Sequence, residues 1–268
     1  MYEYNIYEWI AFFIIYCFIG WVGESIYVSL ECKKWVNRGF MNGPFLPIYG
    51  FGAIIMLFAA LPVRNNLFLI FLFGMIAATA LEYFTGWALE KIFKARYWDY
   101  TYEPFNIQGY ICLGCSITWG VCAMLLLRLL HPFVEKIVIG INHTAMQVFD
   151  YIFIGYFAFD ILISVRQALD LRKIITEYIE HSEEIKRIQK RIDVIIAVIN
   201  DDRENAKEEL EKLKAAIEEK REAFRQKTES FQPRAFKVFK RNPRANNRKH
   251  LINMETLKRY FNNESHGK

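Results

Sequence analysis

Long apolar runs dominate the first 165 residues of this chain, whereas apolar residues alternate with Lys, Glu and Arg over the remaining hundred. A helix that crosses a bilayer needs about 20 predominantly apolar residues. The pattern therefore predicts an all-helical, polytopic membrane domain over residues 1–165, followed by a soluble part. We expect about five transmembrane helices, and they are placed at 6–30, 46–62, 67–93, 110–130 and 144–165. The second is short and begins in a Gly- and Pro-rich stretch, which favours a broken or re-entrant helix.

The pattern changes to that of an amphipathic helix after residue 166. Apolar positions then recur at steps of three and four, which is typical of a coiled coil. They are Ile185, Ile188, Ile192, Ile195 and Ile199, followed by Ala206, Leu210, Leu213, Ile217 and Phe224. The register slips at 200–202, where Asp201 and Glu204 form a candidate capping pair for a new helix. Residues 166–230 are predicted to form either one long helix with a stutter or, as we favour, a cytoplasmic helical hairpin. A coiled coil here would also allow a homo-oligomer.

The segment 231–268 is strongly basic, with ten Lys or Arg residues against two Glu, in a chain whose formal net charge is +5. Phe231, Phe236 and Phe239 are interleaved with these charges. Anionic headgroups attract basic segments near a membrane by about 1 kcal/mol per residue. We therefore expect this tail to bind membrane lipids, and nucleic acid is the alternative partner.

Loop charges predict the orientation of the spans, because Lys and Arg are enriched on the cytoplasmic side. Lys33, Lys34 and Arg38 follow the first predicted span, and Lys94 and Arg96 follow the third, whereas the N-terminus has neither residue type. The chain is predicted to be a multi-pass plasma-membrane protein with its N-terminus outside and its C-terminus in the cytoplasm. No basic residue precedes the first apolar run and no small-residue cleavage site follows it, so we expect a retained span and not a secretory signal peptide.

A short motif, Gly-Trp-x-x-Glu-x-Ile followed by Tyr or Phe, occurs twice, each time at the end of an apolar run. The two copies are Gly20, Trp21, Glu24, Ile26 and Tyr27, and then Gly86, Trp87, Glu90, Ile92 and Phe93. Each copy is followed by an Arg-bearing loop and then by Ile-x-Gly and an aromatic residue, at 48–51 and 107–110. This order predicts an internal duplication, with halves at 6–62 and 67–130 related by an axis along the membrane normal.

Six charged residues around the two copies form the candidate substrate-binding set. They are Glu24, Arg38, Glu82, Glu90, Arg96 and Asp99. A charge at the centre of a spanning helix costs about 2.5–3.5 kcal/mol and usually faces the bundle interior. Glu82 lies two turns deeper than Glu90, so it is the most informative of the six. Arg38 and Arg96 could fold back onto the carboxylates, and such Arg–carboxylate pairs either fix the helix register or form a binding or gating site.

Other polar residues lie in or next to the predicted spans. Asp150 and Asp160 are almost three helical turns apart in the fifth span and could line one pathway at two levels. Asp160 is expected close enough to the cytoplasmic end to reach solvent. His131 precedes Pro132 at a predicted span boundary, where a loop histidine is most often uninvolved in function.

The chain carries none of the short motifs that would identify a nucleotide site or a hydrolase. It has no GxxxxGK[ST], so ATP would have to be used by a separate ATPase subunit. It has no HExxH or GxSxG, so no catalytic residue is identified and whether the chain is an enzyme stays open. Cys112 and Cys115 form a CxxC inside a predicted span, which we interpret as small buried apolar residues. No further ligands are spaced to complete a metal site, and we expect no cofactor.

Two longer motifs, which begin at Glu-containing helix ends, resemble one known family. The first runs from Gly20-Trp21-x-x-Glu24 through Asn37-Arg38-Gly39-Phe40-x-Asn42-Gly43-Pro44 to Pro47-Ile48-Tyr49-Gly50-x-Gly52. The second contains Leu81-Glu82-Tyr83, Glu90, Ala95-Arg96-Tyr97-Trp98-Asp99-Tyr100 and Asn106-Ile107-x-Gly109. Over residues 10–132 the chain resembles the bacterial family Putative ABC-transporter type IV, also labelled CmpB-like. The resemblance implies a multi-span membrane protein, largely from Gram-positive bacteria, and a transporter label without a settled substrate.

Three functions are consistent with these features. The first is a permease-type transport component with a polar site open to the cytoplasmic half of the membrane. The second is a membrane-embedded enzyme that acts on a lipid-linked substrate, because carboxylates with Arg at the inner interface could do acid–base work on a phosphate-bearing lipid. The third is a membrane-anchored scaffold or signalling protein that works through its coiled coil.

Overall fold

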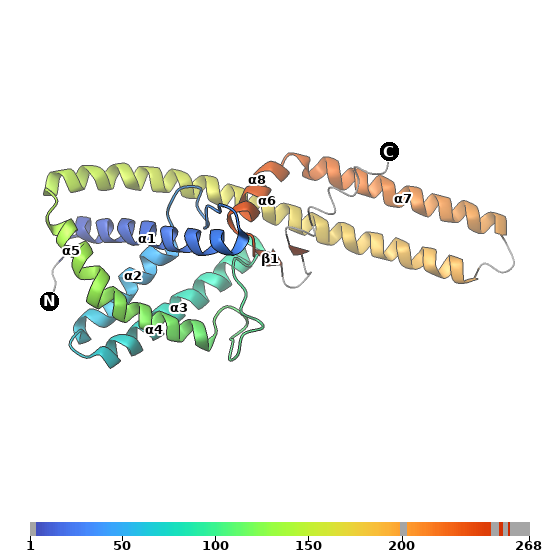
Figure 1. Ribbon diagram of the computed structural model, residues 1–268. Helices are drawn as coiled ribbons and strands as arrows, with labels where there is room; N and C mark the ends of the chain where they lie inside the picture. The colour runs from blue at the N-terminus through green and yellow to red at the C-terminus, as the bar shows by residue number, and fades with distance from the viewer. Residues whose placement is uncertain (1–3, 199–202, 248–251, 254–256, 258–268) are drawn as a thin grey trace. The chain divides into compact units, whose positions relative to one another are not determined.

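The computed structural model describes residues 4–198, 203–247, 252–253 and 257, and these residues are helical apart from short loops and one pair of two-residue strands (Figure 1). The all-helical fold class expected from the sequence is therefore confirmed.

The chain divides into two compact units, and each is described by itself. Unit 1 comprises Met1–Arg166 and Phe239–Ala245, and unit 2 comprises Gln167–Val238 and Asn246–Lys268. Unit 1 thus takes in a short segment from far along the sequence.

The elements follow one another in a simple order. They are α1 (Ile6–Cys32), α2 (Pro47–Ala60), the 3₁₀ turn η1 (Leu61–Val63), α3 (Leu67–Phe93), α4 (Leu113–Leu125), the π-helical η2 (Leu126–Leu130), α5 (His131–Ile139), α6 (His143–Val198), α7 (Arg203–Glu229), α8 (Gln232–Arg241), β1 (Asn246–Asn247) and β2 (Ile252–Asn253). The two strands pair antiparallel.

Polar caps decide where the apolar helices begin. The Asn5 side chain accepts the amides of the first turn of α1, and Asn66 does the same for α3. Asn142 accepts two amides at the start of α6. At α4 the cap is the Cys112 thiol, which accepts the Cys115 amide at 3.3 Å. These contacts satisfy donors that the first turn of a helix leaves free, and they give the CxxC a local structural role.

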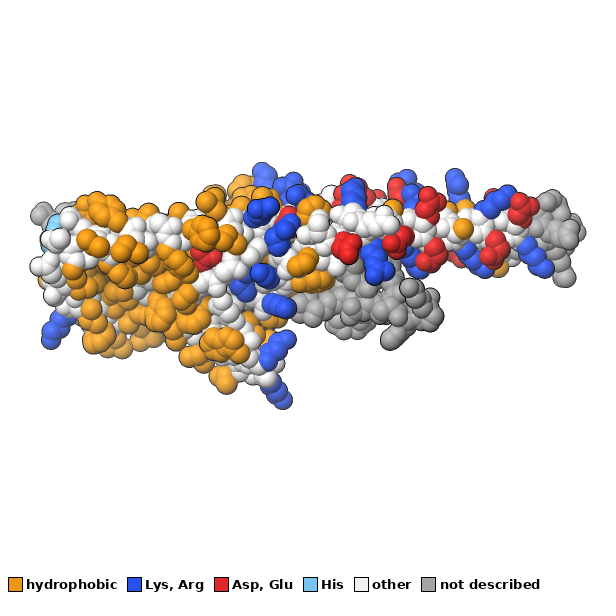
Figure 2. Space-filling view, turned by 90° about the horizontal axis from the view of Figure 1, so that it is seen from above, with side chains coloured by type: hydrophobic (Ala, Val, Ile, Leu, Met, Phe, Trp, Pro, Cys, Tyr) orange, Lys and Arg blue, Asp and Glu red, His pale blue; other side chains and the backbone are white. Residues whose placement is uncertain are grey.

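Four helical segments are long and apolar enough to cross a membrane: Ile6–Cys32, Leu67–Phe93, Leu113–Ile139 and the first part of α6. The second predicted span corresponds to Pro47–Val63, which is apolar but shorter. Hydrophobic side chains cover a broad face of this part of the chain (Figure 2). The protein is therefore a membrane protein, with four helices of spanning length among the described residues.

α1 has the first part of α6 on one side and α2 on the other (Figure 1). The Phe13 ring packs edge-on against Phe51 of α2 and Phe157 of α6, with centroids 4.9 and 5.6 Å away. In α1, 39% of the most apolar stretch is buried, against 22% in each of the other three long helices. The outer helices therefore leave more apolar surface free for lipid.

Contacts at one end of unit 1, here called the N-terminal end, bring together the start of α1, the end of α2 and α5. Tyr4 donates a hydrogen bond to Glu135 of α5. Trp9 stacks on Phe58 of α2, with centroids 4.6 Å apart. The Tyr7 ring meets His143, so α6 also begins at this end.

The opposite end, here called the loop end, carries the two long loops 33–46 and 94–112. Arg38 Nη2 donates to the Tyr97 carbonyl at 3.3 Å, which joins the two loops directly. Phe40 also packs against the Tyr97 ring, with centroids 5.9 Å apart. The two Arg-bearing loops predicted from the repeat therefore lie side by side.

The expectation that His131 lies in a loop is wrong, and so is the predicted end of the fourth span near residue 130. Leu113–Ile139 is one continuous apolar helix. A proline inside an α-helix lacks an N–H and clashes with the carbonyl four residues earlier. The π-helical η2 directly before Pro132 widens the turn and accommodates that ring. His131 is buried, with Nδ1 2.8 Å from the Tyr16 hydroxyl and Nε2 3.2 Å from the Tyr4 hydroxyl.

In unit 2, α6 and α7 lie antiparallel to each other. Glu177 pairs with Lys227 at 2.7 Å, and Glu184 pairs with Lys220 at 2.6 Å. Residue numbers rise along one helix as they fall along the other, so the described parts form a helical hairpin. Acidic and basic side chains alternate along its surface (Figure 2). Such exposed pairs contribute about 0–1 kcal/mol each.

The apolar stripe of the hairpin faces inward in its part nearer residue 166. Ile185, Ile217 and Phe224 are buried. The predicted capping pair Asp201 and Glu204 lies outside the residues whose side chains the structure describes.

His181 should make the stability of unit 2 depend on pH. Its ring is buried and stacks on Phe224, with centroids 5.1 Å apart. Burial lowers the pKa of His181 below its usual value, although Glu184 opposes the shift. Stability from a histidine with a lowered pKa is fully present above the unfolded pKa of about 6.5, and it is lost as the pH falls through the folded pKa. We expect α6 and α7 to lose hydrogen-exchange protection, corrected for intrinsic rates, between about pH 7 and about pH 5.

The control for this prediction is His181→Phe in the full chain, which keeps a stacked ring without a titrating nitrogen. Its protection should change much less over the same pH interval. An equal loss in both proteins would mean that groups other than His181 cause the effect.

Candidate functional site

The first copy of the repeated motif builds a three-residue cluster at the loop end. Gly20 and Glu24 lie one turn apart on the same face of α1. The Tyr49 ring, from the start of α2, lies against Gly20, so that a Cβ on Gly20 would be 2.3 Å from Tyr49 Cβ and Cγ. The Tyr49 hydroxyl donates to Glu24 Oε1 at 2.7 Å, and Arg38 Nε lies 3.4 Å from Glu24 Oε2. Glu24, Arg38 and Tyr49 are called the first cluster.

The second copy builds the same arrangement. A Cβ on Gly86 would lie 3.1 Å from Tyr110 Cδ1, so here too the ring covers the glycine. The Tyr110 hydroxyl donates to Glu90 Oε2 at 2.7 Å, and Arg96 Nε lies 2.6 Å from the same oxygen. Glu90, Arg96 and Tyr110 are called the second cluster.

The two tyrosines do not occupy equivalent sequence positions. Tyr49 directly precedes Gly50, whereas Tyr110 directly follows Gly109. Both hydroxyls nevertheless reach the carboxylate one turn after the motif glycine. Burial, followed by the hydrogen bond to Glu90, raises the pKa of Tyr110, so this hydroxyl stays protonated and donates. The spacing Gly-x-x-x-Glu therefore has a physical meaning, because the glycine seats a ring whose hydroxyl binds the acid.

Asp99 extends the second cluster. Arg96 Nη1 lies 3.3 Å from Asp99 Oδ1, and the Arg96 guanidinium lies 4.5 Å from the centre of the Tyr110 ring. Gly109 has a φ of +74°. A Cβ on Gly109 would lie 2.5–2.8 Å from Thr101 Oγ1, Arg96 Nη1 and Asp99 Oδ1. Only glycine combines this backbone conformation with so close an approach.

Glu82 is a buried acid outside the two clusters and is 5% exposed. The Tyr100 hydroxyl donates to its Oε1 at 3.1 Å, and Trp119 Nε1 donates to its Oε2 at 3.0 Å. The Trp119 ring also meets Tyr49 of the first cluster, with centroids 5.9 Å apart. Burial raises the pKa of Tyr100 and Glu82 adds to the shift, so the Tyr100 hydroxyl stays a donor. No basic side chain in the described part of the chain forms an ion pair with Glu82.

Asp160 does not reach solvent, contrary to expectation, because the α1–α2 loop covers it. It is 4% exposed. Its carboxylate accepts the Asn42 amide and side-chain Nδ2, both at 3.0 Å, and the Gly43 amide at 2.7 Å. A Cβ on Gly43 would lie 1.9 Å from the Tyr156 hydroxyl, so the loop passes very close to α6. Asp160 therefore holds this loop in place.

The end of α8 docks onto the same loop, within unit 1. Arg241 is 6% exposed. Its Nη1 donates to Asn42 Oδ1 at 2.6 Å, and its Nη2 donates to the Phe40 carbonyl at 3.0 Å. Arg38 of the first cluster donates to the side-chain oxygen of Asn242. A basic residue expected to bind lipid headgroups is thus held by protein acceptors.

Replacing Arg241 by alanine is expected to release residues 239–245 from the loop. Hydrogen bonds to a charged group contribute about 1.5–3 kcal/mol, so amide protection in this segment should fall about ten- to hundredfold. Lys240→Ala is the control, because Lys240 is exposed and its removal changes the net charge equally. Equal loss of protection in both variants, measured by hydrogen exchange, would show that charge and not the hydrogen bonds holds the segment.

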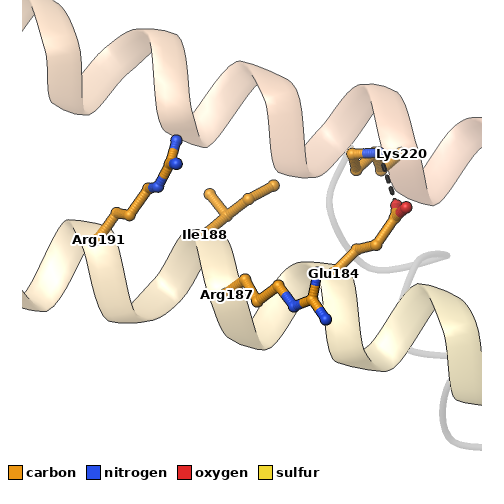
Figure 3. Close-up of a pocket in the computed structure, with 5 residues that line it drawn as sticks. All are labelled: Glu184, Arg187, Ile188, Arg191 and Lys220. Carbon is orange, nitrogen blue, oxygen red and sulfur yellow. Dashed lines mark hydrogen bonds and ion pairs between the residues drawn. The ribbon is translucent and has the colours of Figure 1, made fainter.

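Unit 2 has a shallow groove of its own between α6 and α7, lined by Glu184, Arg187, Ile188, Arg191 and Lys220 (Figure 3). The pair between Glu184 and Lys220 crosses it at 2.6 Å. None of the six predicted site residues lines this groove.

The structure thus brings four of the six predicted residues into the two clusters and joins Asp99 to the second through Arg96. Glu82 belongs to neither cluster, but Trp119 connects it to Tyr49 of the first. Sequence reasoning missed the two tyrosines, Trp119, Tyr100 and Arg241. A signal for the tyrosines existed, because a glycine one turn before a buried acid indicates that a ring can lie there. No local signal pointed to Arg241, which lies 199 positions from its partner Asn42.

Residues 11–165 match the family model described as Putative ABC-transporter type IV, and this is more than half of the 268-residue chain. The matched region contains all six predicted site residues and reaches beyond the two motifs to the end of the apolar part. No curated protein and no solved structure matches the chain.

Proposed function

Since this chain belongs to the family Putative ABC-transporter type IV, we propose that it is a permease-type component of a membrane transport system. The observation that carries this proposal is the doubled arrangement of a carboxylate, an Arg and a Tyr at one end of the apolar bundle. Two similar clusters, with a buried acid that Trp119 connects to one of them, suit a site that holds a polar solute between two halves of a bundle.

In each cluster, a bound solute could replace the carboxylate as the partner of the Arg guanidinium. The Glu24 and Glu90 side chains are 29% and 28% exposed, whereas their Arg partners are 13% and 7% exposed. A solute could therefore approach each pair from the carboxylate side. An anionic group would compete for the guanidinium, which binds carboxylate and phosphate in a two-pronged geometry. Substrate would be held by Glu24, Arg38, Glu82, Glu90, Arg96 and Asp99.

The topology that we propose has five passes, with Pro47–Val63 as the short second one. This helix connects the loop end to the N-terminal end, which supports a return pass despite its length. The N-terminus would lie outside and the loop end in the cytoplasm, as the Lys and Arg in both loops favour. The two halves would derive from duplication. A separate ATPase subunit would supply the energy, because the sequence has no P-loop.

The hairpin and the basic tail have proposed roles outside the bundle. The hairpin would act as a cytoplasmic coiled-coil element, and a homo-oligomer would use Val194 and Ile196, which are 62% and 57% exposed. The part of the tail beyond residue 247 lies mostly outside the described residues, and we propose that its charge binds anionic headgroups.

Glu82→Gln tests the proposed site without removing the local hydrogen bonds. A glutamine can accept from Trp119 through its oxygen and donate to the Tyr100 hydroxyl through its amide. A deletion strain carrying wild type, Glu82→Gln or the exposed control Glu103→Gln would be compared by untargeted metabolite and lipid profiling. The solute that wild type restores would then be measured as uptake into proteoliposomes.

We expect Glu82→Gln to reduce uptake about tenfold or more, because a hydrogen bond to a charged group contributes about 1.5–3 kcal/mol. Glu103→Gln should behave as wild type. Full uptake by Glu82→Gln would remove Glu82 from the site. A lipid that the purified protein converts without an ATPase would replace the transport proposal with the enzymatic one. If deletion of the hairpin alone abolished every effect that the protein has in the cell, the scaffold or signalling function would be favoured instead.

A further inference from the structure

A second buried carboxyl group lies in α6, apart from the two clusters. Asp150 is 0% exposed, and Met146 and Phe153 on the same face of the helix are 4% and 8% exposed. All three lie in the apolar part of α6 that is long enough to cross a membrane. Asp150 therefore faces the interior of unit 1 and not lipid, although its neighbours on the helix are apolar.

Neither oxygen of Asp150 has a hydrogen-bond partner among the described residues. Asp160, ten residues later in the same helix, accepts the amides of Asn42 and Gly43. The contrast separates two roles for the same residue type. Asp160 is paired as a carboxylate should be, whereas Asp150 is not. A buried, unpaired carboxylate is strongly disfavoured, so such a group is expected in its neutral form.

The titratable groups described near Asp150 are tyrosines, a histidine and another acid. From α1, the Tyr7 hydroxyl is near enough for an electrostatic interaction with Asp150. Tyr7 itself lies 3.2 Å from the Tyr151 hydroxyl of α6 and packs against His143. Glu135 of α5, the other acid at this end, accepts from Tyr4. No described Lys or Arg forms an ion pair with Asp150.

We propose that Asp150 is a proton-binding site in the membrane unit, which takes up one proton to become a neutral carboxylic acid and releases it as H⁺. A metal cation is the competing ligand, but Ca²⁺ and Mg²⁺ need about six oxygen ligands. The described residues contain no group of three His, Cys, Asp or Glu side chains that could hold a metal ion.

This site is distinct from the proposed transport site. Asp150 lies toward the N-terminal end, about 15 Å along the helix from Asp160 at the loop end. Its proton would exchange on the side of the membrane opposite the clusters. Ionisable residues inside spans commonly mark proton relays, and Asp150 is placed to sense the pH of that side.

Infrared difference spectroscopy of the full chain in nanodiscs tests this proposal. The wild type should show the carbonyl band of a protonated carboxylic acid, shifted in D₂O, which disappears reversibly as the pH is raised. Asp150→Asn should lack this band. Asp193→Asn, at an exposed position of α6, should keep it. Asp150→Leu, which extends the apolar face, serves as a second variant if the Asn variant fails to fold.

Two results would overturn the proposal. One is an unchanged band, or none at any pH, in wild type and both Asp150 variants alike. The other is a band that responds to added Na⁺, K⁺ or Ca²⁺ at constant pH, because that would make Asp150 a cation site. Both readouts are independent of transport, so the proton site can stand or fall separately from the proposed function.

Discussion

Gly20→Ala should destabilise the protein by about 1–3 kcal/mol or more, as expected when an atom is forced into a well-packed contact. The added Cβ would lie 2.3 Å from Tyr49 Cβ. A Cβ cannot move away by changing rotamer, so α1 and α2 would have to separate. The Tyr49 hydroxyl would then lose Glu24, and the first cluster would open.

Two other glycines serve as graded controls for this prediction. A Cβ on Gly23 would meet nothing within 4 Å. Alanine is favoured over glycine in helices by up to about 1 kcal/mol, so Gly23→Ala should be neutral or stabilising. Gly86→Ala should lie in between, because the nearest atom of Tyr110 is a ring carbon at 3.1 Å that can shift. The thermal unfolding midpoint in detergent should be lowest for Gly20→Ala, intermediate for Gly86→Ala and highest for Gly23→Ala. Equal midpoints for Gly20→Ala and Gly23→Ala would contradict the close approach of Tyr49 to Gly20.

Arg96→Met is expected to have the largest effect among the charged residues. The Arg96 side chain is 7% exposed and binds both Glu90 and Asp99. Removing one partner of a buried ion pair costs about 3–5 kcal/mol, because it leaves uncompensated charge behind. Glu90 and Asp99 are 28% and 16% exposed, so we expect the lower end of that range. Arg38→Met should cost less, because its contact with Glu24 is longer, at 3.4 Å.

Adding Glu90→Gln to Arg96→Met should restore part of the lost stability, since it removes one of the stranded carboxylates. Lys91→Met is the control, because Lys91 is exposed and contacts the Trp87 ring. Denaturation of the wild type, Arg96→Met, Glu90→Gln and the double variant gives the coupling energy between the two residues. If Arg96→Met is no more harmful than Lys91→Met, the pair does not stabilise the loop end.

The long apolar runs made the membrane-length helices predictable, because hydropathy over about 20 residues depends little on tertiary contacts. The Glu24–Arg38 and Glu90–Arg96 ion pairs could be predicted from the repeat, since each pair joins one helix end to the loop that directly follows it. The contacts of the Tyr49 and Tyr110 hydroxyls could not be predicted, because their positions depend on how closely two helices approach each other.

Longer-range contacts explain the errors. Asp160 was expected to reach solvent, but its partners Asn42 and Gly43 lie 118 and 117 positions away. Arg241 was assigned to a lipid-binding tail by composition alone, and composition cannot distinguish a solvated basic residue from one held by carbonyl acceptors. In both cases the same loop, 33–46, provides the partners.

The π-helical turn Leu126–Leu130 also determines which face of the following helix, α5, points inward. Each residue advances a helix by about 100°, so one extra residue per turn rotates the downstream face by that angle. Val134 and Val138, which are buried, owe their inward direction to this offset. Deleting the exposed Leu129 would turn His131 away from its tyrosines while leaving the composition and hydropathy of the segment almost unchanged. Alignments that ignore the helical phase would therefore pair wrong faces across this point.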